Sequence, residues 1–591
     1  MERSTRWAVS WRRIALVAGC AGVFVVGLAS VEAVPAWLVA SPASVRDRGV
    51  EWFLRAVLIA YGVALVLAGP GTLLLAALTY RAWRRRAFRP WMGRGVLAGL
   101  SLLAGLALAE LGASLRGAWA HRMPALPARF KAAPADEIHV VVVGESSALG
   151  DPFGPWLSVG QIVGWQLERV LPARRVRVSV LAERGVNLER MHQKLETLDQ
   201  RPDVLIVYCG HNEFQSRYDW ARGVGHDETP LSPAFAWLFQ ASLRSPLCRL
   251  IYEQTNRKLL AAAPRVARHQ LVDPPLCSPS EAVTVVADFE RRLDAMAFFC
   301  ARINALAILV IPPSNEAGFA PNRSGLHGAE SAAARERFVR AFAAARLAEA
   351  DPRRSITLYD RLLEGHPEFA EAHFRLARQL EKTGDWAGAR RHYIEARDRD
   401  GFPQRCTTPI EDAYRTVAAR RGAVLIDGPA ELRSLSPTGI LNDNLFHDPQ
   451  HPALAGHVTL ARAVLRELRA RGAFGWTGGP VPTLDPAECA AHFQLGSREW
   501  STVCTRVKWF YKTIAKNRFD PSERFAKAKR FGAAAEQIRA GTPPEQAGIP
   551  GLGARPKWVE DPDWAENLPG HRETGLIAKK PASPGKKSTS P

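Results

Sequence analysis

Residues 138–147 read Ile138-His-Val-Val-Val-Val-Gly-Glu-Ser-Ser147, and this stretch decides the fold. A short apolar run that ends at a glycine predicts a buried strand. The strand is expected to stop at Gly144, which puts the Ser146 hydroxyl at the start of a loop. In open α/β sheets, ligands bind at the carboxyl ends of the strands. Ser146 is therefore the first candidate for a reactive group.

The chain beyond this strand alternates between apolar runs and helical stretches. Such alternation predicts an α/β fold, a three-layer arrangement with a parallel sheet between helices. The expected strands are 138–143, 176–181, 204–208, 307–311 and 423–426, and the clearest expected helices are 159–170 and 282–302.

Three further short pieces supply the groups that a serine nucleophile needs. They are Gly185, Gly210-His-Asn-Glu213 and Asp448-Pro-Gln-His451. A serine hydroxyl is a weak nucleophile until a positioned imidazole takes its proton, and the oxyanion that forms then needs hydrogen-bond donors. Each piece alone has a plain alternative, since glycine is common in turns and Asp448 also suits a helix N-terminus.

Together and in this order, the four pieces resemble the blocks of the SGNH/GDSL hydrolase family over roughly residues 136–472. The resemblance implies a flavodoxin-like fold in which Ser146 is the nucleophile, His451 the base and Asp448 the residue that orients the base. It also implies an oxyanion hole formed by the Ser146 amide, the Gly185 amide and the Asn212 side chain. No cofactor and no metal are implied.

Two positions depart from the family pattern. The first block fits G-D-S-x-x-x-G through Gly150, but Glu145 stands in place of the usual Asp. The third block ends in Glu213 where the family commonly has Asp. Neither position is a catalytic atom of the expected mechanism, so the departures concern loop geometry.

Two other kinds of site compete with this interpretation. Gly144-Glu-Ser-Ser-Ala148 is similar to the nucleophile elbow of α/β-hydrolases, but here the serine follows the first strand and the acid lies three residues before the histidine. His447, Asp448, His451 and His457 are all metal-ligand types. Pro449 interrupts a helical pairing of the histidines, and the chain has no His-Glu-x-x-His pattern.

The first 115 residues predict three transmembrane helices. Residues 14–31 and 56–80 carry no charged side chain and 95–114 carries only Glu110, and each run is about long enough to cross a bilayer. Arginines cluster before the first run and between the second and third, which predicts a cytoplasmic N-terminus. The expected location is the bacterial inner (cytoplasmic) membrane, with the catalytic part periplasmic or extracellular. A cleaved signal ending near Cys20 is the alternative.

The sequence predicts seven segments. They are three transmembrane helices (1–115), a linker (116–135), the first part of the hydrolase-like domain (136–330), a helical insertion (331–403), the second part of the domain (404–472), a linker with a helical segment (473–540) and a disordered tail (541–591). The insertion resembles about two tetratricopeptide repeats, as in Leu376-Ala377, Gly384 and Tyr393, with Pro367 at a matching place. The resemblance implies that a protein partner could bind through residues 331–403.

The net charge of +20 does not require nucleic acid as a partner. Much of the excess is arginine beside the apolar runs, where anionic lipid explains it, and no nucleic-acid-binding motif occurs. The segment around Val507–Tyr511 suits either a membrane surface or packing on the catalytic domain. Cys489 and Cys504 are the most local pair that an oxidising compartment would permit to form a disulfide.

These features predict a membrane-anchored serine esterase that forms an acyl-enzyme on Ser146. Its substrate would be an acyl ester, either a lipid or an acylated glycan. The first alternative is an O-acyltransferase, since SGNH-like domains beside membrane helices can resemble polysaccharide O-acetyltransferases. The second alternative is a scaffold without activity that binds an envelope protein through residues 331–403.

Overall fold

The computed structural model describes residues 70–85, 90–120, parts of 126–136, residues 137–215, short pieces of 238–251 and 270–277, and residues 279–326 and 332–556. The chain forms two compact units, and each is taken by itself. One contains residues 1–123 and 216–267, and the other contains 124–215 and 268–591. Residues 216–267, predicted as part of the catalytic domain, thus group with the N-terminal segment.

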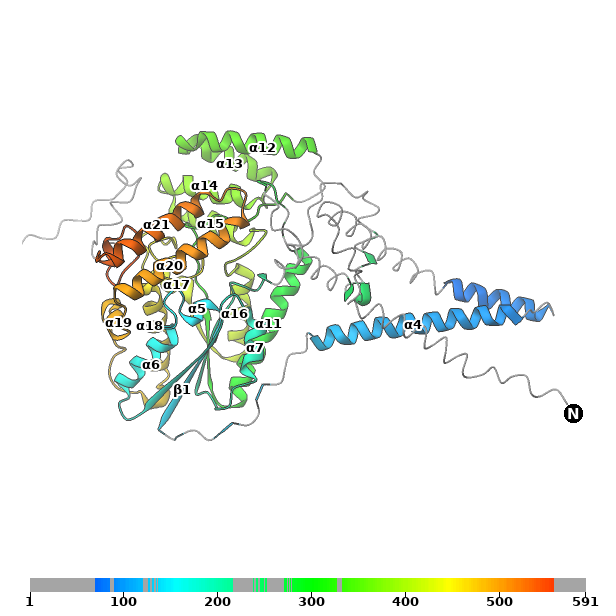
Figure 1. Cartoon of the computed structure of the whole chain (residues 1–591), viewed down its shortest axis with the longest axis horizontal. Helices are drawn as coiled ribbons and strands as arrows, with labels where there is room; N and C mark the ends of the chain where they lie inside the picture. The colour runs from blue at the N-terminus through cyan, green and yellow to red at the C-terminus, as the bar shows by residue number, and fades with distance from the viewer. Residues whose placement is uncertain are drawn as a thin grey trace, which may run out of the picture. The chain divides into compact units, whose positions relative to one another are not determined.

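The larger unit is built on a five-stranded parallel sheet (Figure 1). Its strands are β1 (Glu137–Gly144), β2 (Arg175–Ala182), β3 (Val204–Tyr208), β4 (Leu306–Ile311) and β5 (Val424–Asp427), in the spatial order β2-β1-β3-β4-β5. This is a doubly wound order, in which the chain turns from one side of β1 to the other. The predicted α/β fold with a parallel sheet is confirmed, and the crevice expected at such a turn lies between β1 and β3.

Helices cover both faces of the sheet (Figure 1). One face packs against α6 (Val159–Val170) and α18 (Leu454–Ala470), and the other against α7 (Leu188–Leu195), α11 (Pro279–Arg302) and α16 (Thr408–Arg421). Alternate β1 side chains serve the two cores: Val140 and Val142 join the first, and Val141 and Val143 the second. Burial on both faces explains why β1 reads as an unbroken apolar run.

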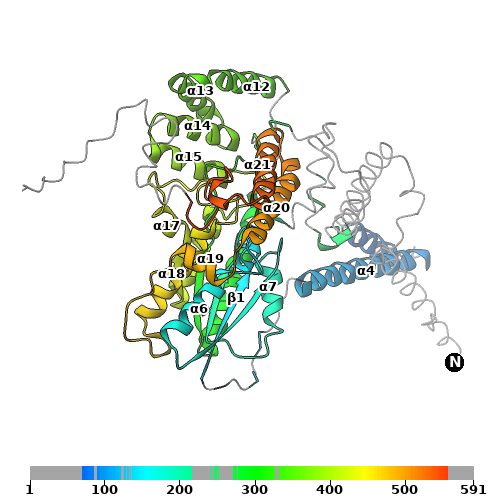
Figure 2. The ribbon, with the colours of Figure 1, turned by 60° about the vertical axis from the view of Figure 1, so that its left-hand side comes forward.

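A helical insertion separates β4 from α16. It consists of α12 (Ala332–Leu347), α13 (Pro352–Gly365), α14 (Ala370–Lys382) and α15 (Trp386–Asp398). Phe342, Tyr359 and Phe369 form the core between its first helices, and Tyr393 packs with Ile440 of the catalytic unit. Figure 2 shows these helices stacked at the top of the unit. Four helices thus lie within the segment 331–403, whose status as an insertion module and whose tetratricopeptide character stay predictions.

The C-terminal segment packs into the core of the larger unit. Its helices are α19 (Pro486–His492), α20 (Ser497–Ile514) and α21 (Ser522–Arg539). Trp500, Val507 and Phe531 share the core of α6 and α18. Residues 541–556, where the sequence predicted the start of a disordered tail, also fold here, and Leu552 is fully buried. The remainder of that tail, 557–591, lies outside the described residues.

The smaller unit includes α4 (Pro90–Ala120) and a helix at 70–84. The two helices approach closely at Gly95 and Gly99, where an added Cβ would lie 3.2 Å from Leu75 and 2.9 Å from Thr72. Within the part of the chain that the structure describes, one helix, Arg94–Leu115, is long and apolar enough to cross a membrane, with a mean hydropathy of 1.9. The predicted span at 14–31 and most of that at 56–80 lie outside the described residues.

Cys209, Cys300, Cys406, Cys489 and Cys504 are buried free thiols. Cys489 and Cys504, the most local disulfide candidates, are separately buried thiols in α19 and α20. Burial raises the pKa of each to about 12, which keeps both thiols protonated and unreactive.

Candidate active site

Ser146 begins the short helix α5 (Ser146–Leu149), directly after β1. The turn depends on Gly144, because a Cβ at this position would lie 2.0 Å from the Tyr208 carbonyl oxygen at the end of β3. The helix ends at Gly150, whose φ of 95° is in the left-handed region that glycine adopts readily. These two glycines therefore allow the turn that places Ser146 at the carboxyl ends of β1 and β3.

The structure brings Ser146, His451 and Asp448 together although Ser146 and His451 are 305 residues apart. His451 Nε2 lies 2.7 Å from Ser146 Oγ, and His451 Nδ1 lies 2.6 Å from Asp448 Oδ2. The bond to the carboxylate keeps the imidazole proton on Nδ1, which leaves Nε2 free to accept the serine proton. All three side chains are at most 5 % exposed.

Asp448 and His451 form one rigid unit on the loop before α18. Asp448 Oδ1 accepts the backbone N–H groups of Gln450 and His451, both at 2.9 Å. Ser147 Oγ donates to the Gln450 carbonyl at 3.3 Å, which ties this loop to the nucleophile helix. Burial lowers the pKa of His451, but the Asp448 carboxylate more than offsets this effect and the pKa is raised.

Asn212 lies on the loop after β3 and is 7 % exposed. Its Nδ2 atom is buried and has no hydrogen-bond partner among the described residues. A buried amide donor without a partner costs free energy unless a ligand satisfies it. The Asn212 side chain therefore has a donor available for a developing oxyanion.

Gly185 follows β2 and has a φ of 70°. The adjacent Arg184 forms a bidentate pair with Asp151 at 2.5 Å, and the Asp151 N–H donates to the Ser146 carbonyl at 2.9 Å. Gly185 is thus connected to the nucleophile loop through two neighbouring residues. The assignment of the Ser146 and Gly185 amides to an oxyanion hole stays a prediction.

The structure gives Glu145 a role that the motif did not reveal. Its fully buried carboxyl accepts three backbone N–H groups, those of Gly210 and His211 on Oε1 (3.1 and 2.8 Å) and that of Asn212 on Oε2 (3.1 Å). Burial and the neighbouring Glu213 raise its pKa to about 8. The residue in the family's Asp position thereby fixes the loop that carries Asn212.

His447 and His457 are not arranged around a metal. Both pack against the Phe153 ring, with centroid distances of 5.9 and 5.7 Å. Burial lowers the pKa of each to about 4, so both are neutral at pH 7. In the described residues there is no group of three or more His, Cys, Asp or Glu that could hold a metal ion.

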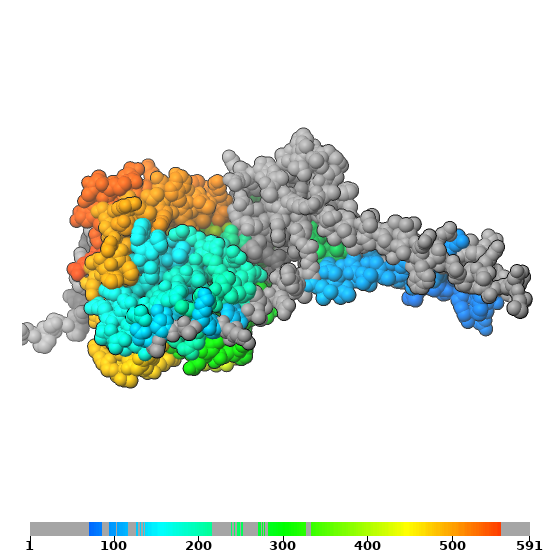
Figure 3. All heavy atoms as spheres, turned by 60° about the horizontal axis from the view of Figure 1, so that its bottom comes forward, coloured from blue at the N-terminus to red at the C-terminus, as the bar shows by residue number. Residues whose placement is uncertain are grey.

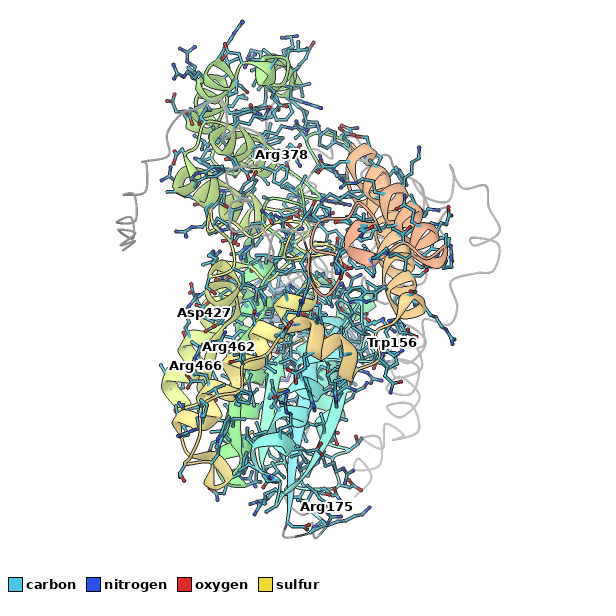
Figure 4. All side chains as sticks on the ribbon, turned by 90° about the vertical axis from the view of Figure 1, so that its left-hand side faces the viewer. Trp156, Arg175, Arg378, Asp427, Arg462 and Arg466 are labelled. Atoms are coloured by element: carbon cyan, nitrogen blue, oxygen red, sulfur yellow. The ribbon has the colours of Figure 1, made fainter. Side chains whose placement is uncertain are left out.

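Helix α20 contributes groups that sequence reasoning missed. The Phe510 ring lies 5.5 Å from the His451 ring, nearly perpendicular to it. Arg506 donates to the Pro152 carbonyl at 2.8 Å and also to that of Gly154, and its guanidinium covers the Trp156 ring at 4.8 Å. Figure 4 labels Trp156 on the side of the unit where α20 lies. No sequence motif marks these contacts, and the hydrogen bonds of Arg506 join segments 352 and 354 residues apart.

Comparison with known proteins adds little to this geometry. No protein-family model and no curated protein matches the chain. Among solved structures, the chain is similar to LAE5, an α/β hydrolase enzyme from the metagenome of Lake Arreo, Spain. The identity is 16 % and the TM-score 0.26, over 58 % of this chain and 97 % of that one. With so distant a match, the function has to be argued from the site itself.

Proposed function

We propose that this chain is a serine hydrolase of the SGNH/GDSL type that acts on carboxylic esters. The supporting observation is the hydrogen-bonded series Ser146–His451–Asp448, with distances of 2.7 and 2.6 Å. A scaffold without activity has no need for a buried series of this kind. The proposal therefore favours catalysis over a purely structural role.

Each group has a defined part in the proposed reaction. Ser146 Oγ attacks the ester carbonyl carbon while His451 Nε2 takes the hydroxyl proton, and Asp448 stabilises the imidazolium that forms. The tetrahedral oxyanion accepts hydrogen bonds from the Asn212 side chain and the Ser146 and Gly185 amides. The proton on His451 passes to the departing alcohol, leaving an acyl-serine. Water, activated by the same imidazole, then releases the acid.

The positions of acid and base support the SGNH type over the α/β-hydrolase type. Asp448 and His451 share one loop and one set of backbone hydrogen bonds. The nucleophile follows the first strand of the sheet, and its partner loop after β3 carries an asparagine with an available donor. This arrangement agrees with the four sequence blocks in order.

We further propose that the N-terminal helices anchor the enzyme in the cytoplasmic membrane with its catalytic unit outside. The apolar helix Arg94–Leu115 and the arginines that precede it support this placement. A membrane-impermeant reagent applied to intact cells should label a cysteine placed at the exposed residue Ala173 if the unit lies outside. Labelling only after lysis would contradict the placement.

A fluorophosphonate probe tests the serine mechanism. The purified full chain in detergent should be labelled covalently, and Ser146→Ala should abolish the label. Ser147→Ala is the matched control because Ser147 is also buried, but its hydroxyl donates to the Gln450 carbonyl rather than to His451. Equal labelling of wild type and Ser146→Ala would refute the proposal.

Acyl transfer to a sugar hydroxyl is a second candidate. Ser146 and His451 are only 5 % and 4 % exposed, and a site that admits little water favours an acceptor other than water. A panel of acyl esters assayed with and without glycan acceptors separates the two reactions. Acylated glycan among the products would indicate transfer, and free acid alone would indicate hydrolysis.

A further inference from the structure

The hairpin of α20 and α21 has an outer face that the catalytic core does not use. We call it the basic aromatic face, and it consists of Trp509, Lys512, Lys516, Phe525 and Lys529. Trp509 is 59 % and Phe525 47 % exposed, and all three lysines are exposed. Figure 3 shows the orange helices at the surface of the catalytic unit.

The hairpin packs antiparallel, which brings the members of this face together. Ser501 Oγ donates to the Ala535 carbonyl at 2.9 Å, and the rings of Tyr511 and Phe531 stack at 6.2 Å. In this register Lys512 is level with Lys529, and Lys516 is level with Phe525. Trp509 and Lys512 of α20, with Lys516 in the 3-10 turn Ala515–Asn517 that follows it, have the helical spacing of one stripe.

The positive charge of this face is not neutralised within the hairpin. None of its three lysines forms an ion pair with a described residue, and Lys512 lies 4.8 Å above the Trp509 ring. The nearby acids have other partners: Glu523 accepts from Arg378 at 2.7 Å, and Asp520 accepts from Ser522 at 2.5 Å. The face thus combines three lysines that have no ion pair with two exposed aromatic rings.

We propose that the basic aromatic face docks on an anionic lipid surface. Tryptophan and phenylalanine suit the boundary between headgroups and acyl chains, and lysine and arginine suit the negative headgroups. A membrane is the favoured occupant because the same chain carries the apolar helix Arg94–Leu115. Under this proposal the segment around Val507–Tyr511 would face a membrane with one side of the hairpin and pack on the core of the larger unit with the other.

Docking would have a consequence for the active site, because α20 would contact the lipid surface and also packs against the candidate catalytic base. Phe510 follows Trp509 directly and its ring packs against that of His451. The lipid surface would therefore lie against the same helix that touches the catalytic base. Docking itself does not depend on the serine chemistry, so Ser146→Ala should dock as the wild type does.

Hydrogen–deuterium exchange of the full chain in lipid nanodiscs tests the proposal. Nanodiscs of phosphatidylcholine alone are compared with an equal mixture of phosphatidylcholine and phosphatidylglycerol. Peptides covering 505–516 and 522–533 should exchange several-fold more slowly in the anionic discs, and high salt should remove the difference. Each basic side chain near an anionic surface is expected to contribute roughly a five-fold preference.

Two charge-reversed proteins complete the test. Changing Lys512, Lys516 and Lys529 to Glu should abolish the protection, whereas changing the exposed Arg337, Arg353 and Arg354 of α12 and α13 to Glu should not. Unchanged protection of β1 and β3 peptides and unchanged labelling of Ser146 establish that each variant is folded. A Trp509→Ala, Phe525→Ala protein should lose part of the protection.

Three outcomes would overturn the proposal. They are equal exchange in both kinds of disc, equal loss of protection in the two charge-reversed proteins, and full protection of the same peptides by soluble polyphosphate in zwitterionic discs. The last result would show that the face binds a polyanion rather than a lipid surface.

Discussion

The charge of the His451 imidazole decides the pH at which this site works. The base must be neutral to accept the Ser146 proton, and Asp448 raises its pKa against the effect of burial. Activity should therefore fall as the pH decreases through a pKa above 6.5, the ordinary value for histidine. Without the carboxylate, burial dominates and the imidazole stays neutral to lower pH.

Asp448→Asn should shift the acid limb of the pH–rate profile to lower pH while the maximal rate drops by orders of magnitude, since the amide favours the wrong tautomer. The profile is measured by ester turnover between pH 4 and pH 9. An acid limb that does not move would mean that another group controls it.

The free amide of Asn212 predicts a purely kinetic defect. Asn212→Ala should lower kcat about 100- to 1,000-fold, or about 2.7 to 4 kcal/mol, with little change in KM, because the donor acts on the oxyanion and not on the bound ester. Since Nδ2 has no partner among the described residues, the melting temperature should stay within a few degrees of wild type. A large loss of stability would instead assign Asn212 a structural role.

At the scale of elements, the contact of α6 with the sheet depends on two glycines. A Cβ at Gly160 would lie 2.1 Å from Val142 Cγ2, and one at Gly164 would lie 2.3 Å from Val178 Cγ2. Alanine is the better helix former by about 1 kcal/mol, but the overlap with a packed strand costs about 1–3 kcal/mol. The steric cost should prevail.

Gly160→Ala is thus predicted to lower the free energy of unfolding, measured by chemical denaturation. The matched control is Gly365→Ala at the end of α13, where an added Cβ meets no atom within 4 Å. That variant should be neutral or slightly stabilised. If both substitutions behave alike, α6 does not pack on the sheet as described.

Elements with a strong local signal could be predicted well. β3 and α6 have the predicted bounds, because β3 is a short apolar run and α6 is capped by Ser158, whose side chain accepts the Gln161 N–H. The packing of α20 on His451 could not be predicted, since its apolar face fits any core of suitable shape.

At the scale of the whole molecule, distant contacts decide how the parts of the catalytic unit are joined. Arg518 after α20 pairs with Glu371 of α14 at 3.1 Å, and both side chains are at most 5 % exposed. Arg378 pairs with Glu523 between the same two regions and is labelled in Figure 4. The C-terminal hairpin thus connects the helical insertion to the catalytic unit.

Glu371→Gln should lower the free energy of unfolding by about 3–5 kcal/mol, because it leaves Arg518 buried without its counterion. The exposed pair Arg340–Glu336 provides the control, and Glu336→Gln should cost less than about 1 kcal/mol. Both values come from denaturant titration of the full chain. Similar losses in the two variants would mean that Arg518 finds another partner.

The sequence could predict the site only as far as its motifs reach. Ser146, His451 and Asp448 come together as predicted from their order and residue types. The loop after the insertion is different: the Cys406 N–H donates to His211 Nδ1 at 3.0 Å over 195 residues. A hydrogen bond of this kind depends on where a loop lies in the folded chain. Short sequence motifs contain no information about that position.

One end of the parallel sheet lies far from the candidate active site. Ser146 follows the carboxyl end of β1, whereas the turn at residues 171–174 precedes the amino end of β2, near Arg175 at the bottom of Figure 4. Eight strand residues span about 26 Å, so this turn is remote from the nucleophile. Pro172 and Ala173 are exposed there. A fluorophore or an immobilisation tag inserted at this turn would report on the enzyme without entering its reaction.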